Sequence, residues 1–432
     1  MRLLQIGGVW LGLGLAAWAA EVPKTLFLSW EGDPRTTMTA QWVRGPGLGK
    51  PSEAGQPETI RWRKTGTSEW NTLVTKTAPF PDPKPWRKRQ VEQSRIQGKR
   101  QVFPDPVKVK ESAWLLVKGT WEGLEPGQEY EFRTGESPVW KFRTAPAQLQ
   151  PGLTFAAGGD SDVTEEAEKI LGVAAGQDPL FLHMGGDLSY SDGQDIAQEL
   201  AFWKMYHRAA QTKEGRLIPF VAGIGNHEVQ GGYWKPGRTF EEMKARAPFF
   251  YAFFGGLYKA EEPVALDFGD YLSLLLLDTQ HILPMEPQTG WLAKNLEARN
   301  QVPWIFASWH VAAYPSARTW DAQQMSGYAR ENWIPLFEKS RTAGVFNHHD
   351  HDLQRVETEG KNGRKITVFG NGGIGADIRR AICEESARLA KARVMAHHIY
   401  IVSLKAELAE VRAIGIGGKE LDRAEIQASS LR

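Results

Sequence analysis

The sequence predicts two domains of different class, an all-β sandwich followed by an α/β domain. The chain has 432 residues, more than one core usually accommodates, so two domains are expected. Apolar and polar residues alternate between Thr25 and Thr144, whereas beyond Gly152 short apolar runs are separated by helix-like segments. The hydrophobic content of 41% and charged content of 24% are typical of a globular protein. The formal net charge of +1 gives no reason to expect nucleic-acid binding.

The first residues have the pattern of an export signal. Arg2 precedes an apolar run over residues 3–16, and the tripeptide AWA at 17–19 has small residues at both recognition positions. We therefore predict a signal peptide over residues 1–19 and a secreted or periplasmic protein. An uncleaved membrane anchor is the alternative, but the run is short for a bilayer span of about 20 residues, so no stable membrane insertion is expected. The single cysteine, Cys383, allows no internal disulfide.

The first domain is predicted from period-two strands. The segments TLFLSW, MTAQWV and TIRWRK place alternate apolar side chains on one face, with turn residues between them. Further on, Leu124 and Pro126 form a turn signal before Tyr130 enters a strand. This arrangement resembles the tyrosine corner of fibronectin type III and other immunoglobulin-like sandwiches. We predict such a domain over residues 21–145.

Two segments interrupt or end this domain. Residues 81–110 begin and end near a PDP tripeptide and are rich in Lys and Arg, which predicts a long basic insertion between strands. A solvated loop is the simpler interpretation, and an electrostatic collar for anionic substrates or membrane surfaces is the other. The segment TAPAQLQPG, residues 144–152, is the predicted linker to the α/β domain, which we place at 150–432.

Seven apolar runs in the second domain read as buried strands, and five of them are followed by polar residues that could bind metal ions or phosphate. Functional groups in α/β sheets gather at the carboxyl ends of strands, and the adjacent glycines let the backbone approach an ion or phosphate closely. The polar residues at these ends are Asp160, Asp187, Tyr190, Asn226, His227, His310, His349 and His351.

The densest of these segments contains three histidines and two aspartates in five positions, residues 348–352. In an extended chain His349 and His351 project to the same side, where they can reach metal ions. Asp350 and Asp352 face away and can orient neighbouring groups. For His348 we predict a packed or solvent-facing imidazole rather than a ligand.

Together these segments resemble the metallophosphoesterase signature and, within it, the purple acid phosphatases. That family pattern runs GDxG, GDxxY, GNH followed by Glu or Asp, a lone His after a strand, and GHxH. The chain has GGDSD, GGDLSY, GNHE, SWH and NHHDH in the same order, with GNGG at residues 370–373 after them. The resemblance implies a calcineurin-like catalytic domain in which helices sandwich two mixed β-sheets.

The resemblance also implies a dinuclear metal centre in which Asp187 bridges both ions. The other ligands would be Asp160, Tyr190 and His351 for the first ion, and Asn226, His310 and His349 for the second. Fe(III) suits carboxylate and phenolate oxygens, and a divalent Zn, Mn or Fe accepts imidazole and amide ligands. Tyr190 favours the iron-tyrosinate purple type over the wider superfamily. Two ions about 3.5–4 Å apart can clamp a phosphate and generate a hydroxide near neutral pH.

The chain departs from the family pattern at two places. Asp162 stands where the family has Gly, and the segment DVTE favours an N-cap role for it, with Glu165 three residues later. No histidine pair follows His310 in the stretch VAAYPSARTWDAQQ, where Arg318 stands instead. The predicted catalytic residues are therefore His227, which would contact the phosphate or leaving group, and Arg318, which could hold a phosphate oxygen.

Three further histidines and an aspartate are assigned to the fold rather than the site. His183 lies inside a predicted buried strand and Asp278 ends another. His397 and His398 lie in a predicted final hairpin, directly before the segment IYIVSL.

The leading prediction is a secreted acid phosphatase that hydrolyses small phosphate monoesters through a metal-bound hydroxide. A phosphodiesterase or nucleotide hydrolase on the same dinuclear site is the second interpretation, and a non-catalytic binding protein that acts through its sandwich is the third. No nucleic-acid partner is expected, and the sequence does not indicate an oligomeric state.

Overall fold

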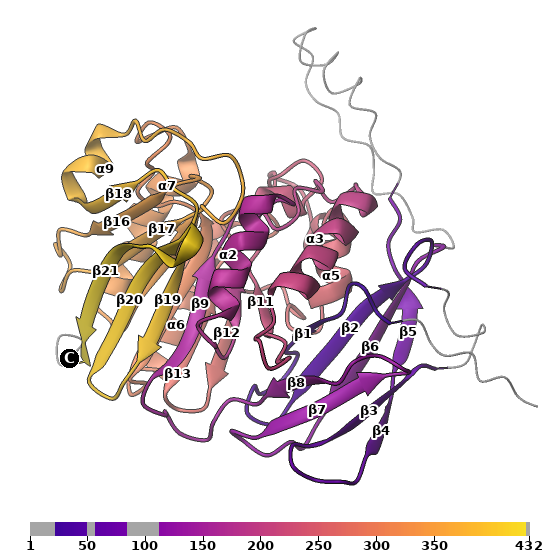
Figure 1. The fold of residues 1–432 in the computed structure, drawn as a ribbon. Coiled ribbons are helices and arrows are strands. Elements are labelled where there is room, and N and C mark those ends of the chain that lie inside the picture. The colour runs from indigo at the N-terminus through magenta and orange to yellow at the C-terminus, as the bar shows by residue number, and fades with distance from the viewer. Residues whose placement is uncertain (1–21, 50–56, 84–111, 429–432) are drawn as a thin grey trace, which may run out of the picture.

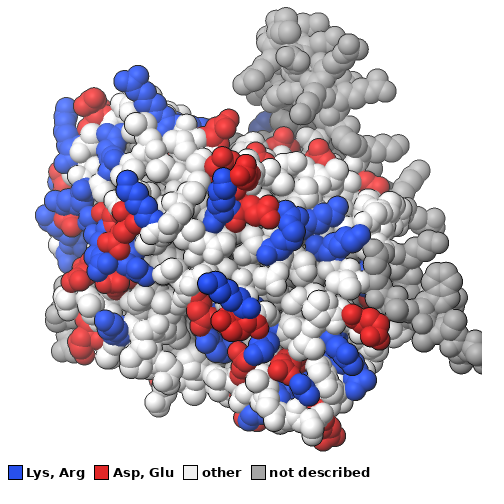
Figure 2. Space-filling model, in the orientation of Figure 1, with Lys and Arg blue, Asp and Glu red and all other residues white. Residues whose placement is uncertain are grey.

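The computed structural model describes residues 22–49, 57–83 and 112–428 (Figure 1). The predicted signal peptide and nearly all of the predicted basic insertion lie outside these residues. In the described part of the chain, no helix is long and apolar enough to cross a membrane. On the face shown in Figure 2, Lys and Arg side chains are interleaved with Asp and Glu.

The N-terminal part consists of two four-stranded antiparallel sheets, and the three predicted strands are present. The first sheet has the order β1-β2-β6-β5, formed by β1 (Phe27–Ser29), β2 (Met38–Arg44), β6 (Leu115–Trp121) and β5 (Lys76–Pro79). The second has the order β4-β3-β7-β8, formed by β4 (Asn71–Val74), β3 (Thr59–Lys64), β7 (Glu129–Thr134) and β8 (Trp140–Arg143).

Aromatic side chains fill the space between these two sheets. Trp121 is buried and packs against the rings of Phe132 and Phe142, at centroid separations of 5.4 and 4.9 Å. The Tyr130 hydroxyl accepts a hydrogen bond from the backbone N–H of Glu125 at 2.9 Å. This bond ties the turn to the strand, as the predicted tyrosine corner requires.

The C-terminal part contains two mixed sheets. The six-stranded sheet has the order β11-β10-β9-β19-β20-β21, formed by β11 (Phe220–Ala222), β10 (Leu182–Met184), β9 (Leu153–Gly158), β19 (His398–Leu404), β20 (Leu408–Gly415) and β21 (Glu420–Gln427). The seven-stranded sheet has the order β12-β13-β14-β15-β17-β16-β18, formed by β12 (Val264–Phe268), β13 (Leu272–Leu276), β14 (Trp304–Val311), β15 (Thr342–His348), β17 (Thr367–Asn371), β16 (Leu353–Glu357) and β18 (Ala390–Val394).

The strands that carry the predicted ligands are parallel within each sheet. In the first sheet β9, β10 and β11 are parallel, and in the second sheet β14 and β15 are parallel. Parallel strands bring their carboxyl ends to one edge, so polar residues that follow them meet there.

Helices cover the outer faces of both sheets, and aromatic residues fill the space between the sheets. The helices are α2 (Glu165–Ala175), α3 (Ile196–Ala209), α4 (Phe240–Lys244), α5 (Pro248–Phe254), α6 (Met285–Ala298), α7 (Gln324–Tyr328), α8 (Ile334–Glu338) and α9 (Glu384–Leu389), with the shorter turns η1 (Asn226–Glu228), η2 (Ala329–Trp333) and η3 (Ile416–Gly418). Residues of α2, α3 and α5 share a core with the six-stranded sheet, and those of α6 and α8 with the seven-stranded sheet. The layers therefore run helix, sheet, sheet, helix, as predicted (Figure 1).

The predicted N-cap role of Asp162 is wrong. Helix α2 begins at Glu165, and its N-cap is Thr164, whose hydroxyl accepts from Ala167 N. The Asp162 carboxylate instead accepts from Val163 N and from the Gln198 side chain. The reason is local, because Thr164 is one of the preferred N-cap residues and stands directly before the first helical turn.

The two parts of the molecule pack against each other through aromatic residues. Phe27 in β1 stacks on Trp203 in α3, with ring centroids 3.7 Å apart. Trp30 contacts the rings of Phe181 and Phe268 edge-on. The sandwich and the two mixed sheets therefore share a continuous apolar core, which fixes their relative orientation.

Candidate metal centre

Five strand ends deliver the predicted ligands to one edge of the two sheets. Asp160 follows β9, Asp187 and Tyr190 follow β10, and Asn226 begins η1 after β11. From the other sheet, His310 lies in β14, and His349 and His351 follow β15. A cluster of ligand atoms within 4.8 Å of one another is formed by Asp160, Asp187, His310 and His349, all buried.

One half of the centre is formed around the Asp187 carboxylate. Its Oδ2 lies 3.1 Å from His310 Nε2, and this nitrogen lies 3.2 Å from His349 Nδ1. Asn226 lies beside this half, because the next residue, His227, donates its backbone N–H to Asp187 Oδ1 at 2.8 Å. The Asn226 amide oxygen accepts from the Tyr233 hydroxyl at 3.5 Å.

The other half is formed around the Asp160 carboxylate. Its Oδ1 lies 3.3 Å from His351 Nε2 and 3.4 Å from the Tyr190 hydroxyl. The Tyr190 hydroxyl is also 3.0 Å from His351 Nε2. Asp160 Oδ2 accepts from the backbone N–H of His349 at 2.8 Å, which links this half to the first.

The outer nitrogens of His310 and His351 face backbone carbonyls, so their inner nitrogens can present their lone pairs to the centre. His310 Nδ1 donates to the Gly185 carbonyl at 3.2 Å, and His351 Nδ1 donates to the Asp377 carbonyl at 2.9 Å. The side-chain amide of Gln323 lies 2.9 Å from His349 Nε2. Such outer partners fix the tautomer and the ring orientation of metal-binding histidines.

A buried carboxylate, Glu228, holds the loop that carries Asp187. It accepts hydrogen bonds from the backbone N–H groups of Asp187, Leu188 and Gly225, at 2.7–2.8 Å. Burial and the nearby Asp187 carboxylate raise the pKa of Glu228 to about 7. Only glycine fits at 225, because a Cβ there would lie 2.3 Å from Asp187 Oδ1.

Four predicted ligands have left-handed backbone conformations. The φ angles of Asp160, Asp187, Tyr190 and His349 are 55°, 53°, 57° and 71°. Such conformations are uncommon for residues other than glycine and cluster at functional sites, because the surrounding structure must hold them in place.

The segment at residues 348–352 is not extended, so the predicted side-by-side projection from a strand is wrong. Two tight turns occur here instead, with Asp350 N donating to His348 O at 2.8 Å and Asp352 N donating to Asp350 O at 2.5 Å. The left-handed φ of His349 breaks the strand alternation. His349 and His351 nevertheless reach the centre, one in each half.

The two aspartates of this segment organise the neighbouring loop, as expected. Asp350 Oδ2 accepts from the backbone N–H groups of Ser316 and Ala317, at 2.6 and 3.0 Å. The Ser316 hydroxyl donates to Asp352 Oδ1 at 2.7 Å. Asp350 Oδ1 forms an ion pair with Arg318.

His348 is packed beneath the centre, which is one of the two predicted environments. Its Nε2 lies 3.0 Å from Ser308 Oγ, and Ser308 Oγ lies 2.7 Å from His183 Nε2. Burial, followed by the neighbouring His183, lowers the pKa of His348 to about 3. A Cβ on Gly185 would lie 1.9 Å from the His348 ring, so glycine leaves the room that this imidazole occupies.

The electrostatics of the centre favour a cation. Burial would raise the pKa of Asp187, but the fields of His310 and His227 outweigh burial and hold it well below its usual range. Burial lowers the pKa of His310, but Asp187 and Asp160 outweigh this and raise it to about 9. Burial and the two aspartates raise the pKa of Tyr190 well above its ordinary value. A phenolate here therefore requires a strongly Lewis-acidic ion.

His227 lies at the edge of the centre with its ring against Tyr190, at a centroid separation of 4.2 Å. Its Nδ1 is 2.5 Å from Asp192 Oδ1, and its Nε2 is 3.9 Å from Asp187 Oδ2. Burial lowers the pKa of His227, but Asp187 and Asp192 outweigh burial and raise it to about 9. The raised pKa favours the protonated ring in the metal-free protein, and its Nε2 faces the centre.

Arg318 lies over the same edge. Its Nη1 donates to the His349 carbonyl at 3.2 Å, besides the ion pair with Asp350. Sequence reasoning did not single out the other residues that line this edge, namely Asp192, Tyr233, Gln323 and Arg379. Asp192 lies two residues after Tyr190, the last residue of the GDLSY motif, and could have been found there. The others come from loops without a recognisable pattern.

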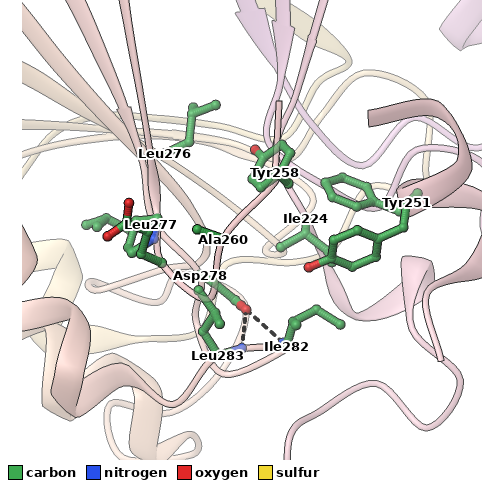
Figure 3. A pocket seen from close by; sticks show the side chains of 12 residues that line it. Ile224, Tyr251, Tyr258, Ala260, Leu276, Leu277, Asp278, Ile282 and Leu283 are labelled. Atoms are coloured by element: carbon green, nitrogen blue, oxygen red, sulfur yellow. Dashed lines mark hydrogen bonds between the residues drawn. The ribbon is translucent and has the colours of Figure 1, made fainter. Parts of the chain in front are cut away.

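Asp278 anchors the fold, as expected, and does not belong to the cluster. Its carboxylate accepts from the backbone N–H groups of His281, Ile282 and Leu283, each at 2.7 Å. Figure 3 shows two of these bonds at the edge of a small pocket lined mainly by apolar and aromatic residues. None of the predicted ligands lines this pocket.

The donor set fits two metal ions. The buried oxygen and nitrogen atoms converge in two groups, and the outer nitrogens of the histidines are engaged elsewhere. Carboxylate, phenolate and imidazole groups are suitable ligands for iron, zinc and manganese.

Comparison with known proteins identifies the class of this domain. Residues 156–352 match the family model of the calcineurin-like phosphoesterases, and this range includes all seven predicted ligands. This segment of the chain therefore has the sequence features of a calcineurin-like phosphoesterase domain.

Two of the similar proteins are purple acid phosphatases. Purple acid phosphatase 15 of Arabidopsis thaliana is 25% identical over 267 residues, which cover 54% of this chain and 48% of that protein. The chain thus matches about half the length of this curated relative.

Two solved structures show a similar fold. The purple acid phosphatase PPD1 from seeds of yellow lupin (Lupinus luteus) has a TM-score of 0.68 at 13% identity, over 94% of this chain and 75% of that chain. PhoD has a TM-score of 0.60 at 14% identity, over 94% of this chain and 89% of that chain.

Proposed function

We propose that this protein is a dinuclear-metal phosphatase of the purple acid phosphatase type, which hydrolyses small phosphate monoesters. The observation that carries the proposal is the convergence of Asp160, Tyr190 and His351 beside Asp187, His310 and His349. In this arrangement one half offers mainly hard oxygen ligands and the other offers two imidazoles. That difference suits one Fe(III) ion and one divalent ion such as Zn, Mn or Fe.

Two ions held here would supply Lewis acidity and would lower the pKa of a water molecule between them. The protein's own side chains would hold the metal ligands in position. Glu228 and the backbone around Asp187 hold the bridging carboxylate, and the outer partners of His310 and His351 hold the two imidazoles.

His227 is the proposed proton donor to the leaving group. Its Nδ1 is held by Asp192 and its Nε2 faces the centre, so the ring can donate to an oxygen that departs there. Its pKa of about 9 in the metal-free protein keeps the imidazole protonated at acid and neutral pH.

Arg318 is the proposed contact to a phosphate oxygen. Only its Nη1 has partners among the described residues, so Nε and Nη2 remain available to an anion. Losing a charge-assisted hydrogen bond costs roughly 1.5–3 kcal/mol, so Arg318→Ala should lower kcat/KM by about ten- to a hundredfold. Arg330→Ala is the matched control, because Arg330 supports the same loop through the Ala313 and Trp320 carbonyls. Equal effects of both variants would remove Arg318 from the site.

The proposed iron makes a spectroscopic prediction. A Tyr190 phenolate bound to Fe(III) absorbs visible light, so aerobically purified protein should be pink or purple and Tyr190→Phe should be colourless. Hydrolysis should fall less than colour, because Asp160, Asp187 and His351 remain. A colourless wild type that is fully active with zinc or manganese would refute the iron assignment but not the phosphoesterase assignment.

The experiment that tests the proposal combines metal analysis with two substrates on one preparation. We expect two metal ions per chain and a higher kcat/KM for p-nitrophenyl phosphate than for bis(p-nitrophenyl) phosphate. A preference for the diester would establish the alternative phosphodiesterase. Absence of both metal and hydrolysis would favour a binding protein.

Two further proposals concern the rest of the chain. The N-terminal sandwich is proposed to be an immunoglobulin or fibronectin type III domain, on the basis of its paired antiparallel sheets and the Tyr130 hydrogen bond. Export to the periplasm or medium is proposed from the apolar N-terminal segment, and processing between Ala19 and Ala20 would test it by N-terminal sequencing.

A further inference from the structure

Two arginines from different loops meet at the backbone carbonyl of one predicted ligand. The Nη1 atoms of Arg318 and Arg379 lie 3.2 and 3.5 Å from the oxygen of His349. The left-handed turn at His349 directs this carbonyl toward both arginines. The two guanidinium groups therefore stand side by side at the edge of the metal centre.

Both loops are fixed to the segment that carries the ligands. Arg379 N donates to the His351 carbonyl at 3.0 Å, and the carbonyl of Asp377, two residues earlier, accepts from His351 Nδ1. On the other loop, Asp350 accepts from Ser316 N and Ala317 N.

The two loops also bind each other. The Ser316 carbonyl accepts from the backbone N–H groups of Ile382 and Cys383, at 2.8 and 3.0 Å. Hydrogen bonds therefore fix both of the loops that carry these arginines. Groups held in this way lose little conformational entropy when they bind a ligand, which is the advantage of a preorganised site.

Among the described residues, these two arginines have a single carboxylate within ion-pair distance. Arg318 has one carboxylate partner, Asp350, whereas Arg379 has none within ion-pair distance among the described residues. Burial lowers the pKa of Arg318, and the charge of Arg379 lowers it further, in keeping with their proximity. Two adjacent cations repel each other, and a bound anion relieves this repulsion.

The position of the pair relative to the centre limits which anion can bind. The guanidinium groups touch the carbonyl of His349, whose side chain belongs to the metal cluster. An anion on Arg379 therefore lies close to a phosphate held by the centre and Arg318. A second phosphate joined to the first through one bridging oxygen fits this short reach.

We propose that Arg379 is a specificity-determining residue that binds a second phosphate of the substrate, so that phosphate anhydrides are favoured over simple monoesters. This inference rests on the proposed function. In the reaction, the water oxygen bonds to the terminal phosphorus, and the bridging P–O bond breaks with its electron pair on the departing phosphate. From inorganic diphosphate the two products are phosphates, and each carries one proton of the water.

The test compares Arg379→Ala with wild type on inorganic diphosphate, ADP, AMP and p-nitrophenyl phosphate. The ratio of kcat/KM for diphosphate to that for p-nitrophenyl phosphate should fall by roughly tenfold or more, mainly through KM, because a charge-assisted contact is lost. Arg379→Lys should restore part of it. Arg380→Ala is the matched control, because Arg380 is the exposed neighbour on the same loop. If kcat/KM for ADP falls relative to that for AMP as well, nucleoside diphosphates are among the substrates that use this site. If only kcat/KM for inorganic diphosphate falls, nucleotides are excluded as substrates of this site.

An unchanged ratio would overturn the inference, as would an equal loss for all four compounds, which would place Arg379 on the scissile phosphate. Hydrolysis of none of them by metal-loaded wild type would overturn the proposed function instead. Calorimetry with methylenediphosphonate and methylphosphonate then decides the second-phosphate site separately. Wild type should prefer the diphosphonate, and Arg379→Ala should lose that preference.

Discussion

The N-terminal sandwich and the catalytic domain differ in where they place left-handed backbone. Among the described residues of the sandwich, every positive φ between 20° and 160° belongs to a glycine. In the catalytic domain eight other residues have positive φ: Asp160, Asp162, Asp178, Asp187, Tyr190, Asp192, Gln280 and His349. Each such residue costs of the order of 1–3 kcal/mol unless its surroundings favour the conformation.

The two regions therefore differ in which residue types occupy the left-handed positions. The sandwich uses glycine at its left-handed turns and therefore carries little backbone strain. The catalytic domain instead places side chains with chemistry at left-handed positions, where glycine would offer no ligand. Hydrogen bonds compensate there, for example Gly375 N and Ala376 N to the Asp160 carbonyl and Glu228 to the backbone of Asp187.

The largest expected effect tests whether the strained positions serve metal binding. Asp187→Asn keeps a residue that tolerates left-handed φ but removes the proposed bridging charge. Mutating a residue that only hydrogen-bonds to a metal ligand already lowers metal affinity or activity by about 10- to 100-fold. Asp187 is itself a proposed ligand, so we expect a larger loss of activity together with loss of metal. Metal analysis and kcat/KM measure this.

Asp178→Asn is the matched control for that variant. Asp178 also has a positive φ of 51°, but it pairs with Arg216 and precedes β10 rather than following it. Its replacement should leave the metal content unchanged. Near wild-type turnover of the metal-loaded Asp187 variant would contradict the dinuclear assignment and the comparison drawn from it.

Much of the fold and of the ligand set could be predicted from the sequence, because both depend on local patterns. Apolar runs mark buried strands, and a carboxylate or imidazole directly after such a run, as at Asp160 or His349, must lie at a strand end. Strands β9, β10 and β11, for example, each coincide with an apolar run predicted to be a buried strand.

The remainder depended on contacts between distant segments. The turn at His349 exists because Asp160 and two arginines bind its backbone, so alternation within the strand could not reveal it. Arg379 and Gln323 reach the centre from loops whose course is set by Ser316 and His351. No residue spacing in the sequence encodes that course.

The second prediction tests the sandwich as a packing domain. Trp121→Ala removes a buried ring that contacts Trp62, Phe132 and Phe142. Truncating a buried Trp costs about 3–5 kcal/mol of unfolding free energy, whereas kcat of the folded protein should not change. Denaturant unfolding measures the change in unfolding free energy, and steady-state kinetics measure kcat.

Val74→Ala, at an exposed position in the same domain, is the control. A fall in kcat would show that the shared core transmits the change to the centre.

The third prediction concerns the charge that the catalytic domain holds without metal. The pKa of His310 is about 9 in the metal-free protein, so its imidazole is protonated below that pH. A metal ion that binds at His310 must therefore displace this proton. Apparent affinity for a divalent ion should therefore rise with pH, by about tenfold per unit, from 6.5 toward 9 and then level off.

Calorimetry of the metal-free protein in two buffers of different ionisation enthalpy measures the protons released. His398→Gln should leave this slope unchanged, because burial lowers the pKa of His398 to about 4 and keeps it neutral throughout the range. A pH-independent affinity would mean that the ion does not bind at His310.

The smallest expected effect uses one substitution in both regions. Gly172 lies inside α2 and Gly123 at a turn of the sandwich, and a Cβ at either position would meet nothing within 4 Å. Only Gly123 has a left-handed φ, of 68°. Gly172→Ala should therefore stabilise the protein by about 0.4–1 kcal/mol, because alanine restricts the unfolded chain. Gly123→Ala should destabilise it by about 1–2 kcal/mol, because alanine disfavours left-handed backbone.

Thermal unfolding of both variants measures the two changes in stability. Opposite signs in equally open surroundings would show that backbone conformation alone decides the outcome. The same sign in both would remove the basis for contrasting the glycine turns of the sandwich with the strained ligands of the catalytic domain.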